Sequence, residues 1–136
     1  MMESERPLET VMTFIGRINA HDVEGLSRLM TPDHLFVDSL GNCWQGLEAM
    51  RAAWTGYFQL FPDYRISHEQ LLQNGNVVAI FGVASGTYSL NGHLGKENSW
   101  QMPAAWKAVV REGLVAEWRI YTDNEAARRV MAVPKS

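Results

Sequence analysis

The chain has 136 residues, of which 46% are hydrophobic and 20% charged, and its net charge is −3. This length and composition predict one globular domain over residues 1–136, with a sizeable core. The acidic balance argues against nucleic-acid or anionic-membrane partners, because both need a basic surface. No apolar stretch approaches the ~20 residues of a membrane span, and the polar start is not a secretory signal. A single cysteine adds to the expectation of a cytoplasmic protein.

Two helices are predicted at the N-terminal end of the chain. Pro7 suits a first helical turn, and the apolar spacing continues to Asn19. Asp22 is placed to cap a short second helix. Residues 31–33 contain a proline and are expected to end that helix, after which residues 34–38 form a strand.

The third predicted helix has the clearest pattern. A glycine-containing turn and a short strand at residues 43–44 lead into it, and it begins at Leu47. Its apolar residues form one wide stripe, which indicates a helix with one buried face. Pro62 ends the helix, because proline disfavours helical backbone at the residue before it. The stripe consists of Met50, Trp54, Tyr57, Phe58 and Phe61.

The second half of the chain is predicted to form strands, followed by a closing helix at residues 124–131. A tight Asn-Gly turn separates the first two strands. This order of elements predicts an α+β fold, with a curved antiparallel or mixed sheet and helices on one face. The predicted strands are residues 64–72, 77–83, 97–110 and 114–122.

The last hairpin allows a prediction of register. If residues 111–113 form a three-residue loop, Trp106 lies opposite Trp118 and the hairpin has one apolar and one polar face. A two-residue turn would slip the register by one and mix these faces. Pro103 indicates a bulge or an edge. The apolar face carries Trp100, Met102, Ala104, Trp106, Ala108, Ala116, Trp118 and Ile120, and the polar face carries Gln101, Lys107, Glu117, Arg119, Tyr121 and Asp123.

The back of the sheet is also expected to be covered. Residues 77–81 are apolar at every position, so both of their faces favour burial. We hypothesise a homodimer that forms through the convex face of the sheet. A monomeric mass at micromolar concentration in light scattering would contradict this hypothesis.

Several short motifs, in this order and at this spacing, resemble the nuclear transport factor 2-like superfamily. The likeness covers residues 8–131 and is closest to the SnoaL-like polyketide cyclases and the ketosteroid-isomerase-like proteins. It implies a cone-shaped fold, with N-terminal helices and a curved sheet wrapped around the long helix, enclosing a deep apolar pocket. The motifs are Asn19-Ala20-His21-Asp22, Phe36-Val37-Asp38, Gly41, Trp44-Gln45-Gly46-Leu47-Glu48-Ala49-Met50, Phe61-Pro62-Asp63, Glu112-Gly113 and Trp118-Arg119-Ile120-Tyr121-Thr122-Asp123.

The resemblance assigns a proton-transfer role to Asp38, which matches the base of ketosteroid isomerases. The oxyanion-hole tyrosine of those enzymes falls at Phe14, and their second acid falls near residues 101–104, where this chain has none. Losing even one such donor costs on the order of 10²–10³ in rate. Steroid isomerisation by that mechanism is therefore not expected here.

Two other groups of relatives also differ from this chain. Limonene-epoxide-hydrolase-like members use an Arg-x-Asp pair on a central strand, whereas residues 77–90 here carry no charge. SnoaL-like cyclases pair an acid like Asp123 with a histidine, and this chain has Phe36 at the histidine position. The feature that remains is a pair of acids, Asp38 and Asp123, in an aromatic pocket.

Each acid also has a purely structural interpretation. Burial against aromatic side chains would make Asp38 a proton carrier, but residues 38–41 equally fit a type I turn with Asp first and Gly fourth. Asp123 is either a second acid or the N-terminal acid of the closing helix, which the helix dipole favours. The preferred hairpin register turns Asp123 away from the aromatic face.

The four histidines do not have the spacing that places two metal ligands on one face, so no metal site is predicted. His34 shares strand parity with Asp38 and is expected to reach the cavity, and His93, in a glycine-rich loop, is a candidate lid residue. The structural alternative for each is a surface or core histidine. The other two are His21 and His68.

The sequence thus predicts a cofactor-free protein that binds a small hydrophobic molecule. As an enzyme it would do acid–base chemistry (isomerisation, cyclisation or dehydration) on a carbonyl or polyketide-like compound. The catalytic candidates are Asp38, Asp123 and Tyr121. The alternative is a non-catalytic ligand-binding or protein-interaction domain of the same fold. The predicted substrate-binding residues are Phe14, His34, Phe36, Trp44, Trp54, Tyr57, Phe58, Trp100, Met102, Trp106 and Trp118.

Overall fold

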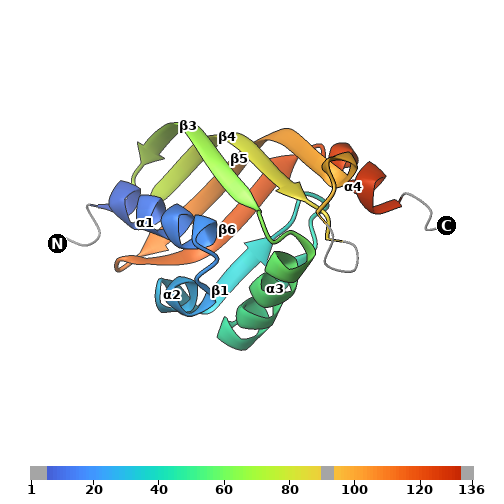
Figure 1. The fold of residues 1–136 in the computed structure, drawn as a ribbon. Coiled ribbons are helices and arrows are strands. Elements are labelled where there is room, and N and C mark those ends of the chain that lie inside the picture. Colours follow the sequence, from blue (N-terminus) through green and yellow to red (C-terminus); the bar gives the residue numbers. More distant parts are fainter. Residues whose placement is uncertain (1–5, 90–93, 133–136) are drawn as a thin grey trace.

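The computed structural model describes residues 6–89 and 94–132. Its helices are α1 (Pro7–Asn19), α2 (Val23–Arg28), α3 (Leu47–Leu60), the 3₁₀ turn η2 (Lys96–Asn98) and α4 (Glu125–Ala132). Its strands are β1 (Met30–Val37), β2 (Cys43–Gln45), β3 (Arg65–Asn74), β4 (Val77–Thr87), β5 (Ser99–Arg111) and β6 (Leu114–Thr122). Within these ranges the four α-helices and one six-stranded mixed sheet confirm the predicted α+β fold (Figure 1).

The strand order of the sheet is β2-β1-β6-β5-β4-β3. The β1 and β6 strands run parallel, and the other neighbouring pairs in the described ranges are antiparallel. α1 packs across β3 to β6, whereas α3 packs on β1, β2 and α2. Figure 1 shows α1, α2 and α3 on the same side of the sheet and α4 at its end. None of the helices in the described part of the chain is long and apolar enough to cross a bilayer.

The turn between the first two helices connects them to the rest of the core. Asp22 caps α2 as predicted, because its side chain accepts a hydrogen bond from the Gly25 N–H at 2.9 Å. His21 has a φ of 56°, in the left-handed region that few non-glycine residues adopt. Its ring stacks on Phe58 with centroids 4.1 Å apart, and its Nε2 lies 2.9 Å from the carbonyl oxygen of Tyr64. His21 therefore holds the end of α3 against the N-terminal helices.

β1 begins earlier than predicted. Residues 31–33 were expected to end the second helix, but they lie inside β1, and this prediction was wrong. The reason is an interruption of the parallel ladder: Met30 lies opposite Val115 and Leu35 opposite Glu117, with an irregularity between the two pairs. Pro32 lies in that irregular stretch, where its missing N–H removes no regular ladder hydrogen bond.

The β5–β6 turn has two residues and not the three predicted. Arg111 lies opposite Leu114, and the turn residues Glu112 and Gly113 have φ values of 52° and 78°. Positive φ at both central residues is typical of a type I′ turn, whose twist matches that of the flanking strands. The prediction of a three-residue loop assumed that only Gly113 would adopt a left-handed backbone conformation. Glu112 adopts the left-handed conformation as well.

A bulge in β6 compensates for the shorter turn. The pairing shifts by one residue at Ala116, which has no partner in β5. Beyond it Trp106 lies opposite Ile120, and the predicted pairing with Trp118 was wrong. Because the bulge adds the residue that the turn lacks, the two faces of the hairpin stay segregated as predicted. Trp106 and Trp118 are both 1% exposed, with ring centroids 6.4 Å apart.

Pro103 lies in an interior strand but at the end of one ladder. It faces Val83 of β4, while the pairing of β5 with β6 ends at Ala104, opposite Thr122. The Thr122 hydroxyl donates a hydrogen bond to the Pro103 carbonyl oxygen at 2.7 Å. Pro103, which has no N–H, therefore lies where β6 no longer pairs with β5. At this position β5 is an edge on its β6 side, as the proline predicted.

Candidate functional site

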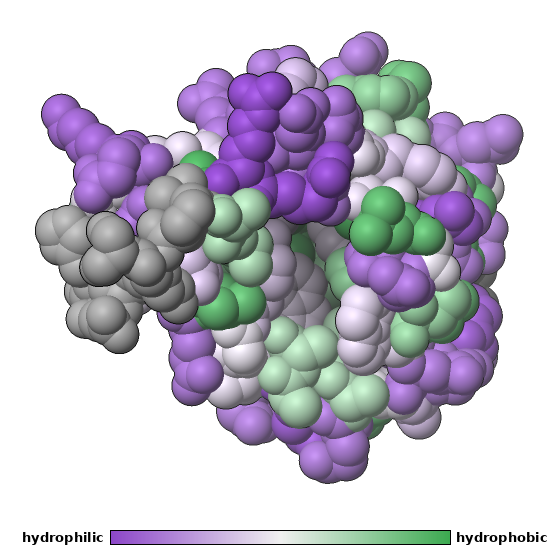
Figure 2. All heavy atoms as spheres, turned by 90° about the vertical axis from the view of Figure 1, so that its right-hand side faces the viewer, coloured by the Kyte–Doolittle hydropathy of each residue, from purple (hydrophilic) through white to green (hydrophobic). Residues whose placement is uncertain are grey.

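A cavity of about 660 Å³ lies between α3, α4, β1 and the inner faces of β5 and β6. Figure 2 shows its opening as a hollow at the end of the molecule where α4 lies. Its lining is mostly apolar, and its volume falls within the range of pockets that hold small organic molecules. The deeper lining residues Met50, Trp106 and Trp118 are almost fully buried.

Most of the predicted substrate-binding side chains line this cavity, and Asp38 lines it with them. The strands β1, β2, β5 and β6 supply aromatic side chains and one methionine, and α3 supplies two aromatic side chains. The predicted residues in the lining are Phe36, Trp44, Trp54, Tyr57, Met102, Trp106 and Trp118.

Four predicted residues lie outside the lining. Phe14 is fully buried and packs against Trp118, with centroids 4.9 Å apart. Phe58 stacks on His21, and Trp100 packs edge-on against Phe61 at 5.2 Å. These three side chains support the cavity from behind, and the fourth, His34, is described below.

His34 is fully buried, and its Nδ1 lies 2.6 Å from the carbonyl oxygen of Val115. Burial lowers the pKa of His34, and the hydrogen bond to Val115 only partly opposes this effect. The ring is therefore neutral, and Nδ1 carries the proton because it faces a carbonyl oxygen. Its Nε2 has no hydrogen-bond partner in the described part of the chain. His34 is a core histidine that packs near Phe14, with centroids 6.1 Å apart.

Other lining residues were not singled out from the sequence. Met50 and Phe61 belong to the predicted helical stripe, and Ile120 belongs to the predicted apolar face, so a signal for them existed. Tyr64 was assigned to a strand without a role. Four further lining residues, Ala52, Ala53, Gly56 and Leu60, belong to α3. Another group comes from the rim, where α4 meets the turn after β1, and no sequence pattern indicates that contact. It includes Ser39, Thr122, Asn124, Ala127, Arg128 and Met131.

Asp38 forms a turn at the edge of the cavity. Its Oδ1 accepts hydrogen bonds from the N–H groups of Leu40 and Asn42, both at 2.9 Å, and its Oδ2 accepts one from the Asn42 side chain at 3.1 Å. Gly41 N–H donates to the Asp38 carbonyl oxygen at 3.0 Å. Three of the roughly four acceptor positions of the carboxylate are thus used by its own turn. Proton transfer by Asp38 stays a prediction, and it would use the position left on Oδ2.

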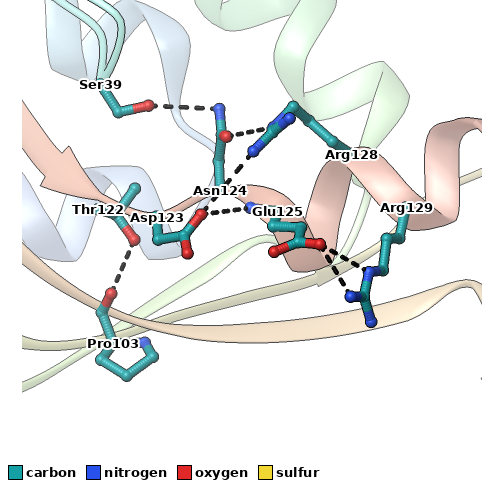
Figure 3. Close-up of polar contacts among 8 residues, drawn as sticks. All are labelled: Ser39, Pro103, Thr122, Asp123, Asn124, Glu125, Arg128 and Arg129. Atoms are coloured by element: carbon teal, nitrogen blue, oxygen red, sulfur yellow. Dashed lines mark hydrogen bonds and ion pairs between the residues drawn. The ribbon is translucent and has the colours of Figure 1, made fainter.

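Tyr121 and Asp123 lie away from the cavity. Tyr121 is 48% exposed on the outer face of the sheet, with the Arg119 guanidinium 4.9 Å from its ring centroid. Asp123 Oδ1 accepts a hydrogen bond from the Glu125 N–H at 3.1 Å and lies 3.8 Å from an Arg128 nitrogen, so it caps α4 (Figure 3). Neither residue belongs to the lining, and no contact of theirs supports the predicted catalytic role.

The rim of the cavity is held together by polar contacts around Asn124. Its side-chain nitrogen donates to the Ser39 hydroxyl at 3.3 Å, and its side-chain oxygen accepts from Arg128 Nε at 2.6 Å (Figure 3). These contacts join the turn after β1 to α4. The Arg128 side chain stays 61% exposed. The cavity therefore combines an apolar interior with a rim whose polar groups satisfy one another.

Two tyrosines of the lining are strongly affected by burial. Burial raises the pKa of Tyr57 well above its usual range. It does the same for the pKa of Tyr64, to which the nearby Tyr57 adds. Both phenols therefore stay protonated at neutral pH and present O–H groups.

No cluster of three or more His, Cys, Asp or Glu side chains suited to a metal ion occurs within residues 6–89 and 94–132. His21 is used in the core, and His68 lies exposed on β3. His93, the candidate lid residue, lies outside the described residues. Cys43 is a free, exposed thiol.

Comparison with known proteins identifies the same fold. Residues 11–118 match the family model of the SnoaL-like domain. A protein assigned as a SnoaL-like polyketide cyclase, from Jannaschia sp. CCS1, is 20% identical with a TM-score of 0.82, over 97% of this chain and 95% of that one. No curated protein gives a significant match.

Two further solved structures contain small molecules. A hypothetical protein with a ketosteroid isomerase-like fold, from Catenulispora acidiphila DSM 44928, was solved in complex with trimethylamine; it is 16% identical, with a TM-score of 0.79 over 93% of this chain and 94% of that one. TerC, co-crystallised with polyporic acid, is 17% identical, with a TM-score of 0.76 over 92% and 97%. At these identities the likeness shows a shared fold alone.

Proposed function

Since the chain belongs to the SnoaL-like domain family, we propose that it binds a small hydrophobic molecule in the cavity beneath α4. The observation that carries this proposal is the cavity itself, about 660 Å³ with an aromatic and aliphatic lining. Interiors are normally close-packed, so an apolar space of this size favours an occupant. The small molecules in the structures of two relatives support the same use of the fold.

The narrower proposal is acid–base chemistry on a carbonyl or polyketide-like compound. Asp38 would move the proton, because it is the carboxylate of the lining and keeps one acceptor position free. The relative from Jannaschia sp. CCS1, assigned as a polyketide cyclase, supports this reaction type. The hydrogen bonds that occupy Asp38 favour the alternative, a ligand-binding domain without catalysis. Both the catalytic and the non-catalytic function require ligand binding. They differ in whether Asp38 transfers a proton.

Two helical glycines provide a direct test of binding. Gly56 lines the cavity and Gly16 lies on α1 away from it, and a Cβ added at either would meet nothing within 4 Å. We expect Gly56→Leu to fill the cavity and Gly16→Leu to leave it open. With 8-anilinonaphthalene-1-sulfonate as the fluorescent probe, Gly56→Leu should weaken binding by about tenfold or more, and the control should bind like the wild type. Equal binding by all three proteins would contradict the proposal.

A second copy of the chain is proposed to cover the outer face of the sheet. In the described ranges no helix lies over β3 to β5 there, and Leu72 and Phe81 are 53% and 42% exposed. The same face carries the Lys107–Glu117 ion pair, at 3.0 Å, and an Arg119 Nε that is buried with no partner in the described chain. Charges of both signs beside an apolar strip suit a self-complementary two-fold contact.

Light scattering at micromolar concentration tests this second copy. We expect a dimer mass for the wild type and a monomer mass for Phe81→Asp, because a buried charge in the contact would lack a partner. Leu94→Asp, exposed but in the segment before η2, is the matched control and should remain a dimer. A monomeric wild type would contradict the proposal.

A further inference from the structure

One wall of the cavity contains a continuous group of aromatic side chains with hydrogen-bond donors, which we call the donor cluster: Trp54, Tyr57, Tyr64 and Trp100. Ring centroids are 6.0 Å apart for Trp54 and Tyr57, 4.9 Å for Tyr57 and Tyr64, and 6.1 Å for Tyr64 and Trp100. The first three side chains line the cavity, and Trp100 packs behind Tyr64.

The polar atoms of the donor cluster are not satisfied by the described part of the chain. The indole nitrogens of Trp54 and Trp100 are buried, and neither has a hydrogen-bond partner in the described chain. The hydroxyls of Tyr57 and Tyr64 also have none among residues 6–89 and 94–132. Buried polar groups in folded proteins are nearly always paired, so two neighbouring buried indole nitrogens without partners in this part of the chain, beside two unbonded hydroxyls of cavity-lining tyrosines, need an explanation.

The chemistry of the donor cluster defines what would satisfy it. An indole N–H donates and accepts nothing, and a buried phenol that keeps its proton also donates. The Asp38 carboxylate uses three of its roughly four acceptor positions within its own turn and accepts nothing from the donor cluster. A ligand with an oxygen acceptor on a flat apolar body therefore matches the wall in both shape and polarity.

Tyr64 is held in place on both sides. Its N–H donates to the Phe61 carbonyl oxygen at 3.0 Å, and its carbonyl oxygen lies 2.9 Å from His21 Nε2. The preceding Asp63 accepts hydrogen bonds from the N–H and hydroxyl of Thr87, both at 2.7 Å. Donors fixed in advance by their surroundings are what a site for a developing oxygen charge requires.

We propose that the donor cluster binds the carbonyl oxygen of the ligand, with the hydroxyls of Tyr57 and Tyr64 as its hydrogen-bond donors. The same donors would stabilise an enolate oxygen in any reaction that removes a proton next to that carbonyl. This proposal rests on the proposed function, because it needs the cavity to hold a ligand. It adds the orientation of the ligand: its oxygen faces Tyr64, and the rest of its body lies along Trp106 and Trp118.

A pair of tricyclic probes tests the proposal. 9-Fluorenone has one carbonyl group on a flat hydrocarbon, and fluorene has the same ring frame without it. We expect the wild type to bind fluorenone about five- to tenfold more tightly than fluorene, measured by quenching of tryptophan fluorescence. Tyr57→Phe and Tyr64→Phe should each reduce this preference and the double variant should abolish it, with fluorene binding unchanged. Tyr88→Phe, which contacts Phe61 from outside the lining, should bind like the wild type.

The infrared carbonyl stretch of bound fluorenone provides a second readout, and its wild-type measurement does not depend on the variants folding. Two hydrogen bonds should lower its frequency in the wild type relative to fluorenone in hexane, and the double variant should restore it. An unshifted frequency, or equal affinities for both probes in every protein, would overturn the donor site and leave the cavity in place.

Two other results would overturn the donor site for different reasons. Binding of neither probe would overturn the proposed function and the donor site together. Binding of choline in place of fluorenone would show that the same rings form an aromatic cage for a cation, since ring faces attract quaternary ammonium groups.

Discussion

The rim and the wall of the cavity use polar groups in opposite ways. At the rim, Asp38 is bonded by its own turn, and Asn124 joins Ser39 to Arg128. In the wall, the donor cluster has polar atoms that nothing in the described chain accepts from. The acids drew attention in the sequence, yet the unpartnered groups of this wall belong to aromatic side chains. A polar group without a partner in the protein is therefore a better guide to ligand binding than a residue type that is reactive in solution.

Removing the Asp38 carboxylate is the largest expected effect, and it tests whether the rim takes part in chemistry. Asp38→Asn keeps a side-chain oxygen for the turn but removes the proton acceptor. If Asp38 is a general base, α-proton exchange of 2-tetralone in D₂O, followed by NMR, should slow by about 10²–10⁴. Asp123→Asn, which alters the α4 cap and an exposed ion pair with Arg128 outside the lining position of Asp38, should leave exchange unchanged. Unaltered exchange in Asp38→Asn would favour binding without catalysis.

Truncating Trp118, which lines the cavity, tests how much this side chain contributes to the stability of the fold. Trp118 is 1% exposed and packs on Phe14 and Trp106. Trp118→Ala should lower the free energy of unfolding by about 3–5 kcal/mol in urea titrations, because it deletes a large buried side chain. A loss under about 1 kcal/mol would mean that Trp118 borders space on both sides, and the cavity would be larger than described.

The pH dependence of stability tests the core behind the wall. Burial lowers the pKa of His34 below its ordinary value of 6.5, so the unfolded chain takes up a proton at higher pH than the folded one. The stability that His34 contributes is full above pH 6.5 and falls as the pH drops below it, by up to about 1.4 kcal/mol per pH unit. His34→Gln should flatten the decline below pH 6.5, and His68→Gln, at an exposed position, should not. An equal slope in all three proteins would contradict this assignment.

The smallest expected effect lies at the rim. Arg128 is largely exposed, so Arg128→Ala should change the free energy of unfolding by less than about 0.5 kcal/mol. The matched control is Arg129→Ala, whose Glu125 partner is also exposed. A loss well above 1 kcal/mol for Arg128 alone would show that its bond to Asn124 holds α4 over the opening.

Much of the fold was predictable because periodicity records which face of an element is buried. The stripe of α3 contained Trp54 and Tyr57, which line the cavity, and the alternation in the last hairpin contained Trp106 and Trp118. These patterns still identify the buried face when the length of a turn is predicted wrongly. The predicted turn was one residue too long, and the bulge at Ala116 restored the same faces.

The rest depended on tertiary contacts that leave no periodic trace. The shift in register caused by the two-residue turn is offset by the bulge at Ala116. The faces of the hairpin are unchanged by the pair, so the sequence pattern indicates neither of them. Arg128 and Asn124 reach the rim because α4 packs against β5 at the end of the sheet, and a short closing helix does not indicate what it covers. For Asp38, the sequence offered both a turn and a pocket acid, and the structure shows the turn lying at the pocket. Tyr64 stayed unnoticed because its unpaired hydroxyl can be recognised only when its surroundings are known.

The indole N–H signals of the five tryptophans give the most direct test of a ligand-filled cavity. In ¹H–¹⁵N spectra of the wild type titrated with 9-fluorenone, we predict that the signals of Trp54, Trp106 and Trp118 shift together and saturate. The signal of Trp44, which is more exposed at the rim, should move less. Saturable shifts confined to Trp44, or no shift in any indole, would contradict the proposal.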